Sequence, residues 1–410
     1  MLPLLILFLG RLHYCFSHNL DEVSLPKSYL LDKSFIASDQ SNSEKVVSVA
    51  DYGAKGDGND DSQAFQKAWK EVCASSTSAT LMVPNSKSYH LKPVTFEGPC
   101  KANVKVVVEG AIQASNNIAD WGQENPSYWI KFDGVDNLIV QGGGTINGNG
   151  KTWWQNSCKR KQSSALTFYS CNKLRVDNLR MIDSQKMHLS FERCTNVNAS
   201  HISITAPEES PNTDGIHVTQ TQNIVITDCV IQTGDDCISI VSGSKNVVAR
   251  NINCGPGHGI SIGSLGEGNS AAQVSGVTVD TAKLTGTTNG VRIKTWQGGR
   301  GYARDITFSN VVMQNVKNPI IIDQNYCDSD KPCHQQGSAV EVSGVVYKNI
   351  KGTSASKVAI DFECSKSVPC HDILLQDINL VGVDGGSVES SCQNVHWGKT
   401  GTVVPFCSNN

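Results

Sequence analysis

A recurring apolar pattern constrains the fold of this chain more than any other feature. An apolar residue is followed by a second two positions later and a third five positions after the first, and the pattern returns at start-to-start intervals of 23 to 39 residues. Side chains two apart lie on the same face of a strand, so each copy predicts a short strand. The copies are Leu174/Val176/Leu179, Val197/Ala199/Ile202, Ile224/Ile226/Cys229, Val247/Ala249/Ile252, Val277/Val279/Ala282, Ile306/Phe308/Val311, Val345/Tyr347/Ile350 and Ile373/Leu375/Ile378.

Strands at this irregular but bounded period predict the coils of a parallel β-helix, in which each coil buries its apolar side on the next. An ordinary β-sandwich is the alternative, but its turn signals recur every ~8–12 residues. We expect an all-β, single-domain solenoid over residues 46–407. Ahead of the repeat, Phe65, Ala68, Trp69 and Val72 have the spacing of an amphipathic helix, which would cap the open N-terminal edge.

Length and charge limit the classes of function. A chain of 410 residues with 39% hydrophobic content can bury a large core, and it would suggest two or three domains unless one all-β domain absorbs it. The formal net charge of -3 argues against coating nucleic acid or an anionic membrane. A polyanionic ligand would therefore have to meet a local basic cluster.

The N-terminal segment indicates secretion. The opening MLPLLILFLG has the length of a signal-peptide core but no early Lys or Arg, so we interpret residues 1–17 as an atypical signal-peptide-like segment. Residues 18–45 are polar and without a period, and we interpret them as an N-terminal extension. In a secreted protein Asn198, in the sequence NAS, would be a glycosylation acceptor.

The fifteen cysteines also indicate a secreted protein, because disulfides form and persist in oxidising compartments. Cys327/Cys333 and Cys364/Cys370 have the spacing of small disulfide loops and not that of a zinc site.

Acidic residues recur in two turn-rich stretches, SPNTDGIHV and QTGDDCISI. Taken alone, such aspartates are usually turn caps. Asp214 and Asp235 are 21 residues apart and Asp236 and His258 are 22 apart, which is one coil in each case, and Arg292 follows 34 residues later after a longer coil. Because stacked strands lie about 4.8 Å apart, residues one coil apart lie about one rung apart. We therefore expect these side chains on one wall of the solenoid.

Two details concern the backbone of that wall. Lys294 lies two residues after Arg292, so both cations face the same way, although an exposed charged strand would look the same. Asp235 and Asp236 are adjacent and would point to opposite faces of a regular strand. Both can serve one site only if the chain after Gly234 forms a turn or bulge.

Three carboxylates, a histidine and two cations suit hydrolysis of a glycosidic bond in an acidic sugar. One carboxyl with a raised pKa would protonate the leaving oxygen while another activates water. Arginine and lysine would pair with sugar carboxylates. Two alternatives remain open: the aspartates could hold calcium in a lyase, or the solenoid could bind polysaccharide without catalysis. His258 alone would more often be structural, but its flanking glycines favour close approach of a ligand or backbone.

The segments SPNTDG, TGDDC, GPGHGISIGS, RIKTWQG and NPIIIDQNYC, in this order, resemble the signature segments of plant polygalacturonases, secreted enzymes that hydrolyse α-1,4-linked galacturonan in pectin. The likeness extends from about Val46 to near Cys407. It implies a right-handed parallel β-helix and single-displacement hydrolysis with inversion. It also implies that no metal or other cofactor is needed.

By position, the resemblance implies that Asp235 is the general acid and that Asp214 and Asp236 hold and activate the water. His258 is similar to the histidine that supports their protonation state. Four residues match positions that contact the sugar units around the cleaved bond: Asn212, Arg292, Lys294 and Tyr326.

The resemblance also implies disulfides between Cys73 and Cys100 and between Cys237 and Cys254, together with the small C-terminal loops, and Cys392 and Cys407 are further disulfide candidates. Predictions for three other cysteines come from their positions in the apolar repeat. Cys229 is predicted to be a buried thiol, and Cys171 and Cys194 are predicted to stack or bond on neighbouring coils. The segment CKRKQSSA looks shorter than in plant relatives, which leaves Cys158 without its usual partner.

Together these observations predict hydrolysis of polygalacturonan in the plant cell wall, with internal cleavage favoured over cleavage from the chain end. A calcium-dependent pectate-type lyase and a non-catalytic galacturonan-binding protein are the alternatives. We expect a secreted monomer of the apoplast that binds neither nucleic acid nor membranes. Leucine-rich inhibitor proteins bind plant relatives, but no segment of the sequence indicates such a contact.

Overall fold

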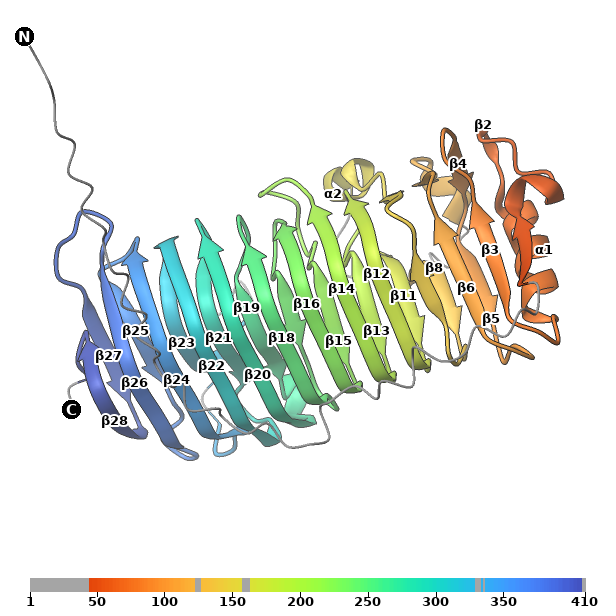
Figure 1. Cartoon of the computed structure of the whole chain (residues 1–410). Coiled ribbons are helices and arrows are strands. Elements are labelled where there is room, and N and C mark those ends of the chain that lie inside the picture. The colour runs from red at the N-terminus through yellow and green to blue at the C-terminus, as the bar shows by residue number, and fades with distance from the viewer. Residues whose placement is uncertain (1–43, 122–126, 157–162, 329–332, 335, 408–410) are drawn as a thin grey trace, which may run out of the picture. The chain divides into compact units, whose positions relative to one another are not determined.

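The computed structural model describes residues 44–121, 127–156, 163–328, 333–334 and 336–407. The expected signal-like segment, nearly all of the polar extension and Cys158 lie outside these residues. The unit from Glu44 onward is a parallel β-helix whose strands stack in register along its axis (Figure 1).

Two parallel sheets form the walls of the described coils. The eleven-stranded sheet consists of β5 (Val94–Glu97), β8 (Tyr128–Asp133), β11 (Ser164–Tyr169), β13 (Leu189–Glu192), β15 (Ile216–Thr219), β17 (Ile238–Ile240), β19 (Ile260–Leu265), β21 (Asn289–Trp296), β23 (Asn318–Tyr326), β25 (Val358–Glu363) and β27 (Glu389–Gln393).

The seventeen-stranded sheet consists of β1 (Lys45–Ser48), β2 (Asp57–Asp60), β3 (Ala79–Val83), β4 (Ser88–Leu91), β6 (Val104–Val108), β7 (Ala111–Ala114), β9 (Ile139–Gln141), β10 (Thr145–Asn147), β12 (Asn172–Ile182), β14 (Thr195–Thr205), β16 (Gln222–Gln232), β18 (Lys245–Cys254), β20 (Ala271–Thr285), β22 (Arg300–Val316), β24 (Glu341–Ser354), β26 (Cys370–Gly382) and β28 (Val395–Val404).

The apolar repeat lies on β12, β14, β16, β18, β20, β22, β24 and β26, and its first residues are paired in order across all eight strands. The expectation of stacked coils is confirmed. Between the second and third apolar residue of each copy, one residue has a φ between 50° and 59°. This left-handed bend explains why the third residue follows three positions after the second, because an extended strand would need two. The bend residues are Asn178, His201, Asp228, Asn251, Thr281, Asn310, Asn349 and Asp377.

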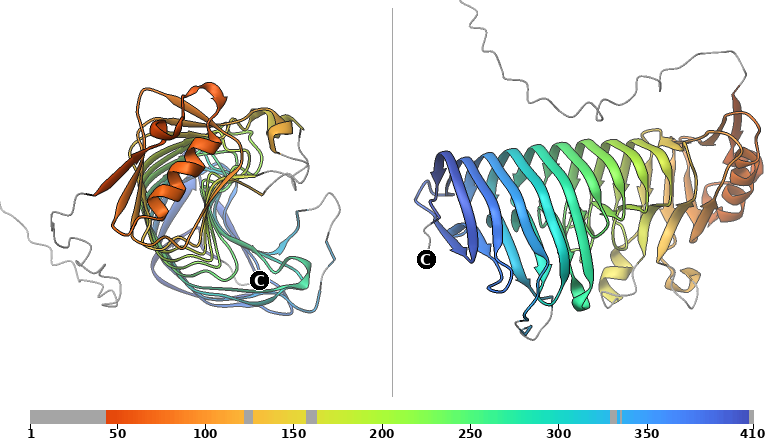
Figure 2. Two further views of the ribbon diagram at one scale, coloured as in Figure 1. Left: turned by 90° about the vertical axis from the view of Figure 1, so that its right-hand side faces the viewer. Right: turned by 90° about the horizontal axis from the view of Figure 1, so that it is seen from below.

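Helix α1 (Ser62–Cys73) closes the N-terminal end of the coils, as the sequence predicted (Figure 2). Its buried Trp69 packs against Phe96 and Phe132, with ring centroids 5.2 and 5.4 Å away. The other helices of the described residues are short and lie in connections: η3 (Val49–Tyr52), η4 (Ile118–Trp121), α2 (Lys151–Asn156) and η5 (Glu267–Asn269). Among the described residues, no helix is long and apolar enough to span a membrane.

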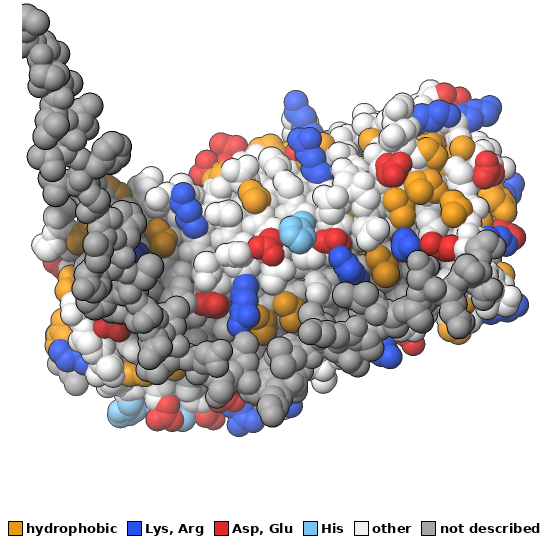
Figure 3. Space-filling model, viewed as in Figure 1, with side chains coloured by type: hydrophobic (Ala, Val, Ile, Leu, Met, Phe, Trp, Pro, Cys, Tyr) orange, Lys and Arg blue, Asp and Glu red, His pale blue; other side chains and the backbone are white. Residues whose placement is uncertain are grey.

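The described residues contain five disulfides, which pair Cys73 with Cys100, Cys237 with Cys254, Cys327 with Cys333, Cys364 with Cys370, and Cys392 with Cys407. Cys171, Cys194 and Cys229 are buried free thiols. On the face seen in Figure 3, acidic and basic side chains are interspersed, in keeping with the small net charge. Any attraction for a polyanion must therefore be local.

Candidate active site

The turn between β16 and β17 carries two of the three aspartates. Asp235 and Asp236 lie in this irregular stretch, not in a strand, which lets both side chains serve one cluster. Gly234 makes the turn fit, because a Cβ there would lie 2.1 Å from the backbone oxygen of Ser210. The turn therefore packs directly on the stretch that leads to Asp214.

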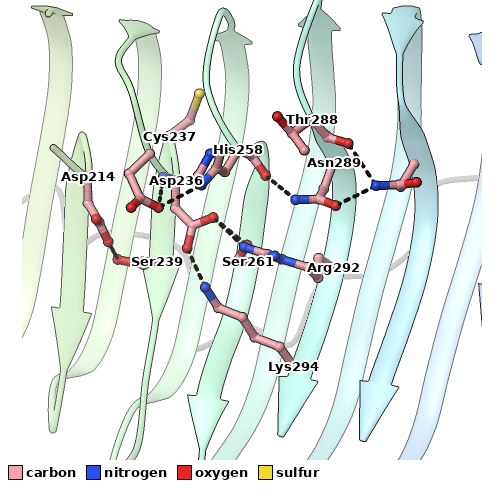
Figure 4. Close-up of polar contacts among 12 residues, drawn as sticks. Asp214, Asp236, Cys237, Ser239, His258, Ser261, Thr288, Asn289, Arg292 and Lys294 are labelled. Carbon is pink, nitrogen blue, oxygen red and sulfur yellow. Dashed lines mark hydrogen bonds and ion pairs between the residues drawn. The ribbon is translucent and has the colours of Figure 1, made fainter. Parts of the chain in front are cut away.

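Asp236 is the most enclosed of the three carboxylates, with only 2% of its side chain exposed. Arg292 Nη2 donates to Oδ1 and Lys294 Nζ to Oδ2, each at 3.0 Å (Figure 4). Both cations project from β21, as their spacing predicted. The buried carboxylate is thus compensated on both oxygens, which an ionised buried group requires.

Asp235 lies against His258, whose Nδ1 is 3.0 Å from Asp235 Oδ1. Two backbone amides also donate to Asp235. Asp236 N donates to Asp235 Oδ1 at 2.7 Å, and His258 N donates to the backbone oxygen of Asp235 at 2.8 Å. Asn212 Nδ2 donates to Asp235 Oδ2 at 3.4 Å. His258 remains 40% exposed, so this pair can exchange protons with solvent.

Asp214 precedes β15 and is buried, with 8% of its surface exposed. Ser239 Oγ donates to Asp214 Oδ2 at 2.6 Å, from the next coil (Figure 4). Burial and the charges of Asp235 and Asp236 raise the pKa of Asp214 well above its usual range, and the Ser239 hydrogen bond and Lys294 only partly oppose them.

The electrostatics differ from the simple expectation for a general acid. Burial favours the neutral form of Asp235, but the hydrogen bond and charge of His258, together with the charge of Lys294 and the backbone amide of Asp236, outweigh burial and lower the pKa of Asp235. The raised pKa belongs to Asp214 instead. This follows from unequal pairing, because Asp236 has two cations and Asp235 has His258, whereas Asp214 has a serine.

Tyr326 lies on the far side of the two cations. Its ring centroid is 5.4 Å from Lys294 Nζ, and the ring meets Trp296 edge-on at 5.3 Å. Burial raises the pKa of Tyr326. All eight residues singled out in the sequence for catalysis or substrate contact thus lie in or beside one cluster.

Three polar residues of the cluster were missed by sequence reasoning: His217, Ser239 and Ser261. Ser261 Oγ donates to Asp236 Oδ1 at 2.7 Å, and His217 Nδ1 lies 2.8 Å from Ser239 Oγ. Each serine lies three residues after a residue of the predicted wall, Asp236 or His258, but serines on strands are too common for that spacing to stand out. Only the register across coils reveals them.

The cluster can also be examined as a metal site, because Asp235, Asp236 and His258 each offer a ligand atom within 4.8 Å of the others. A calcium ion prefers an all-oxygen ligand set, which a histidine does not supply. Arg292 and Lys294, both 3.0 Å from Asp236, would also repel a cation there. The donor set therefore fits proton transfer better than calcium binding.

Paired carboxylates with a proton-exchanging histidine and two cations, set on the outer face of a solenoid, define a glycoside hydrolase built on a parallel β-helix. Residues 73–404 match the family Glycosyl hydrolases family 28, and the chain belongs to that family.

The relatives agree with this assignment. The chain is 58% identical over 356 residues to a polygalacturonase of Persea americana, covering 85% of this chain and 77% of that protein. It is 56% identical over 375 residues to Polygalacturonase-2 of Solanum lycopersicum, covering 90% and 82%. The fold is similar to that of the Erwinia carotovora polygalacturonase, with a TM-score of 0.70 and 23% identity over 87% of this chain and 97% of that one.

Proposed function

We propose that this chain is a polygalacturonase that hydrolyses α-1,4-galacturonosidic bonds in de-esterified pectin by single displacement with inversion. The observation that carries the proposal is the shared cluster of Asp214, Asp235 and Asp236 with two cations beside it. A neutral glycan would not need Arg292 and Lys294, whereas galacturonate units bring carboxylates with which these cations can pair.

In this mechanism Asp235 and His258 act as the general acid. They lie 3.0 Å apart, close enough to share one proton, and the hydrogen bond to His258 is the largest of the effects that lower the pKa of Asp235. When Asp235 passes that proton to the leaving oxygen, the pair loses one proton. His258, partly exposed, then recovers it from solvent.

Asp214 and Asp236 act on the water. A raised pKa makes Asp214 a stronger base than an ordinary carboxylate, as long as the pH lies above it. Asp236, whose two carboxylate oxygens accept from Arg292 and Lys294, can orient the water. The activity should therefore fall on the acidic side as Asp214 takes up a proton.

Internal cleavage is supported by where the cluster lies. Asp214 precedes β15 and Asp235 precedes β17, in the middle of the eleven-stranded sheet, with further rungs on both sides. A polymer lying across these rungs would extend past the cluster in both directions. Asn212 and Tyr326 lie at the cluster where they can contact the units flanking the cleaved bond.

Secretion to the cell wall is supported by the five disulfides, which persist in oxidising compartments. We propose that the protein acts there as a monomer on an acidic polysaccharide. A leucine-rich inhibitor protein, as known for plant relatives, is a partner to be tested by binding.

The test is to incubate the secreted protein with de-esterified polygalacturonate, with and without a chelator, and to follow reducing ends, ultraviolet absorbance and viscosity. We expect chelator-resistant reducing ends without an ultraviolet gain, an early fall in viscosity, and a loss of more than about 1000-fold in Asp235→Asn. A chelator-sensitive ultraviolet gain would instead establish a lyase.

A further inference from the structure

Two serines of the eleven-stranded sheet each hold one of the carboxylates that act on water. Ser239, on β17, donates to Asp214 Oδ2 at 2.6 Å, and Ser261, on β19, donates to Asp236 Oδ1 at 2.7 Å (Figure 4). The two serines are paired in register on neighbouring strands. Each serine is almost fully buried, so solvent water does not compete for its hydroxyl.

A serine hydroxyl has one hydrogen and two lone pairs, and it can rotate. The arginine on the next strand removes that freedom for Ser261: Arg292 Nε lies 3.1 Å from Ser261 Oγ. Because an arginine can only donate, the serine accepts from it and must direct its own hydrogen elsewhere. The remaining partner is Asp236.

The same arrangement recurs around Ser239, with a histidine in place of the arginine. His217, Ser239, Ser261 and Arg292 are successive register partners on β15, β17, β19 and β21. His217 Nδ1 lies 2.8 Å from Ser239 Oγ. When Asp214 is ionised it takes the only hydrogen of Ser239, so Nδ1 must carry a hydrogen and donate to the serine.

The charged groups around His217 favour a neutral ring. Burial and the charges of Lys186 and Lys294 lower the pKa of His217 to about 4, against the opposing charge of Asp236. Asp214 Oδ2 lies 4.0 Å from Nδ1. Over most of the acidic pH range the neutral imidazole of His217 therefore acts as a fixed hydrogen-bond donor and does not add a positive charge to the cluster.

We propose that His217 is a positioning residue, which holds the Ser239 hydroxyl toward Asp214 and so favours the ionised form of this carboxylate, the form that receives a proton from water. The proposal rests on the proposed hydrolytic function and adds a residue to it. His217 acts through the serine and need not touch the reacting atoms.

The consequence has a definite sign. A hydrogen bond donated to a carboxylate favours its charged form, and the Ser239 bond opposes the burial and the like charges that raise the pKa of Asp214. Without a fixed donor the pKa of Asp214 rises further. The base is then protonated at a higher pH, and the acidic limb of the kcat/KM profile moves upward.

Four variants separate the steps of this argument. Ser239→Ala removes the donor, and His217→Phe keeps a ring but leaves the serine free to rotate. His217→Asn retains an amide N–H at about the position of Nδ1. His201→Asn, on the exposed bend of β14, is the matched control.

We expect Ser239→Ala to move the acidic limb up by about one pH unit, since a hydrogen bond to a charged group is worth about that much. His217→Phe should move it in the same direction by a smaller amount. His217→Asn should restore most of the wild-type limb, and His201→Asn should leave it in place. Thermal unfolding of each variant, measured in parallel, identifies any that is misfolded.

The proposal is overturned if the acidic limb of folded His217→Phe coincides with that of the wild type, or if His217→Asn behaves like the phenylalanine variant. A fall in kcat/KM by the same factor at every pH would assign His217 a packing role only. If the wild-type protein releases no reducing ends, the proposed hydrolysis itself fails. This outcome differs from an active enzyme whose variants leave the acidic limb of the kcat/KM profile unchanged.

Discussion

At the scale of single residues, Lys294 has more than one role in the cluster. It shares the buried Asp236 with Arg292, and its charge also lowers the pKa of Asp214 and of Asp235. With 9% of its side chain exposed, it is screened little by solvent. Besides the sugar contact that the sequence predicted for it, Lys294 therefore acts electrostatically on Asp214 and Asp235 and forms an ion pair with Asp236.

We expect Lys294→Met to lower kcat/KM by about 10- to 100-fold, as for the loss of one charge-assisted hydrogen bond near the reacting centre. The acidic limb should also move to higher pH, because the charge that lowers the pKa of Asp214 is lost. Steady-state kinetics across pH measure both effects. Lys283→Met, at an exposed position on β20, is the control and should match the wild type.

At the scale of elements, the turn between β16 and β17 positions the chemistry, and the strands around it supply the support. Gly234 lies against the backbone of Ser210 and Glu208, so the two turns that carry the aspartates touch each other directly. Thr213 Oγ1 also accepts from Gly234 N at 3.0 Å. Movement of either turn therefore moves carboxylates on both.

Gly234→Ala should reduce kcat by at least about 100-fold, because an added Cβ 2.1 Å from a carbonyl oxygen forces the turns apart and small misplacements of catalytic groups are costly. Gly398→Ala, on β28, adds a Cβ with no atom within 4 Å and should behave as wild type. Near-wild-type kcat in the first variant would contradict the role given to this contact. Circular dichroism checks that both variants fold.

The sequence predicted the elements better than it predicted the contacts. The apolar repeat defined eight strands and their stacking, and one-coil spacing placed Asp214, Asp235 and Asp236 together. It did not locate the individual left-handed bends: Asn or Asp occupies six of the eight bend positions, but His201 and Thr281 occupy the other two. Nor could it identify Ser239, whose importance depends on register between coils.

Charge assignments within the cluster also lay beyond the sequence. The resemblance implied an acid at Asp235, and a raised pKa seemed the natural mark of that residue. The structure gives the raised pKa to Asp214, because His258 offsets the burial of Asp235. Spacing shows which groups meet, but pairing and burial decide which of them holds a proton.

At the scale of the whole molecule, each coil packs mainly on its two neighbours, and the ends of the stack have only one. Helix α1 covers the N-terminal end, and the disulfide between Cys73 and Cys100 fixes the last residue of this helix to the segment before β6. The cluster lies several rungs away, on strands β15 to β23 and on the turns that precede β15, β17 and β19. Stability at this end and activity should therefore be separable.

Replacing Cys73 and Cys100 together by serine should lower the free energy of unfolding by about 2–4 kcal/mol, measured by urea denaturation, and leave kcat/KM unchanged at low temperature. Replacing Cys237 and Cys254 is the contrasting pair, because Cys237 directly follows Asp236. That variant should lose activity as well as stability. Equal losses of activity in both variants would show that the end of the stack and the cluster are coupled.

The stacking of one coil per rung gives the molecule a built-in unit of length. The reacting groups come from a few consecutive rungs, so a coil inserted between Asp214 and Asp235 would move them a further strand spacing, about 4.8 Å, apart. A coil added elsewhere would lengthen only the track on which a polymer can lie. Duplication of coils outside the cluster can therefore change the length of polymer that related chains bind. The few rungs that carry the chemistry must stay consecutive.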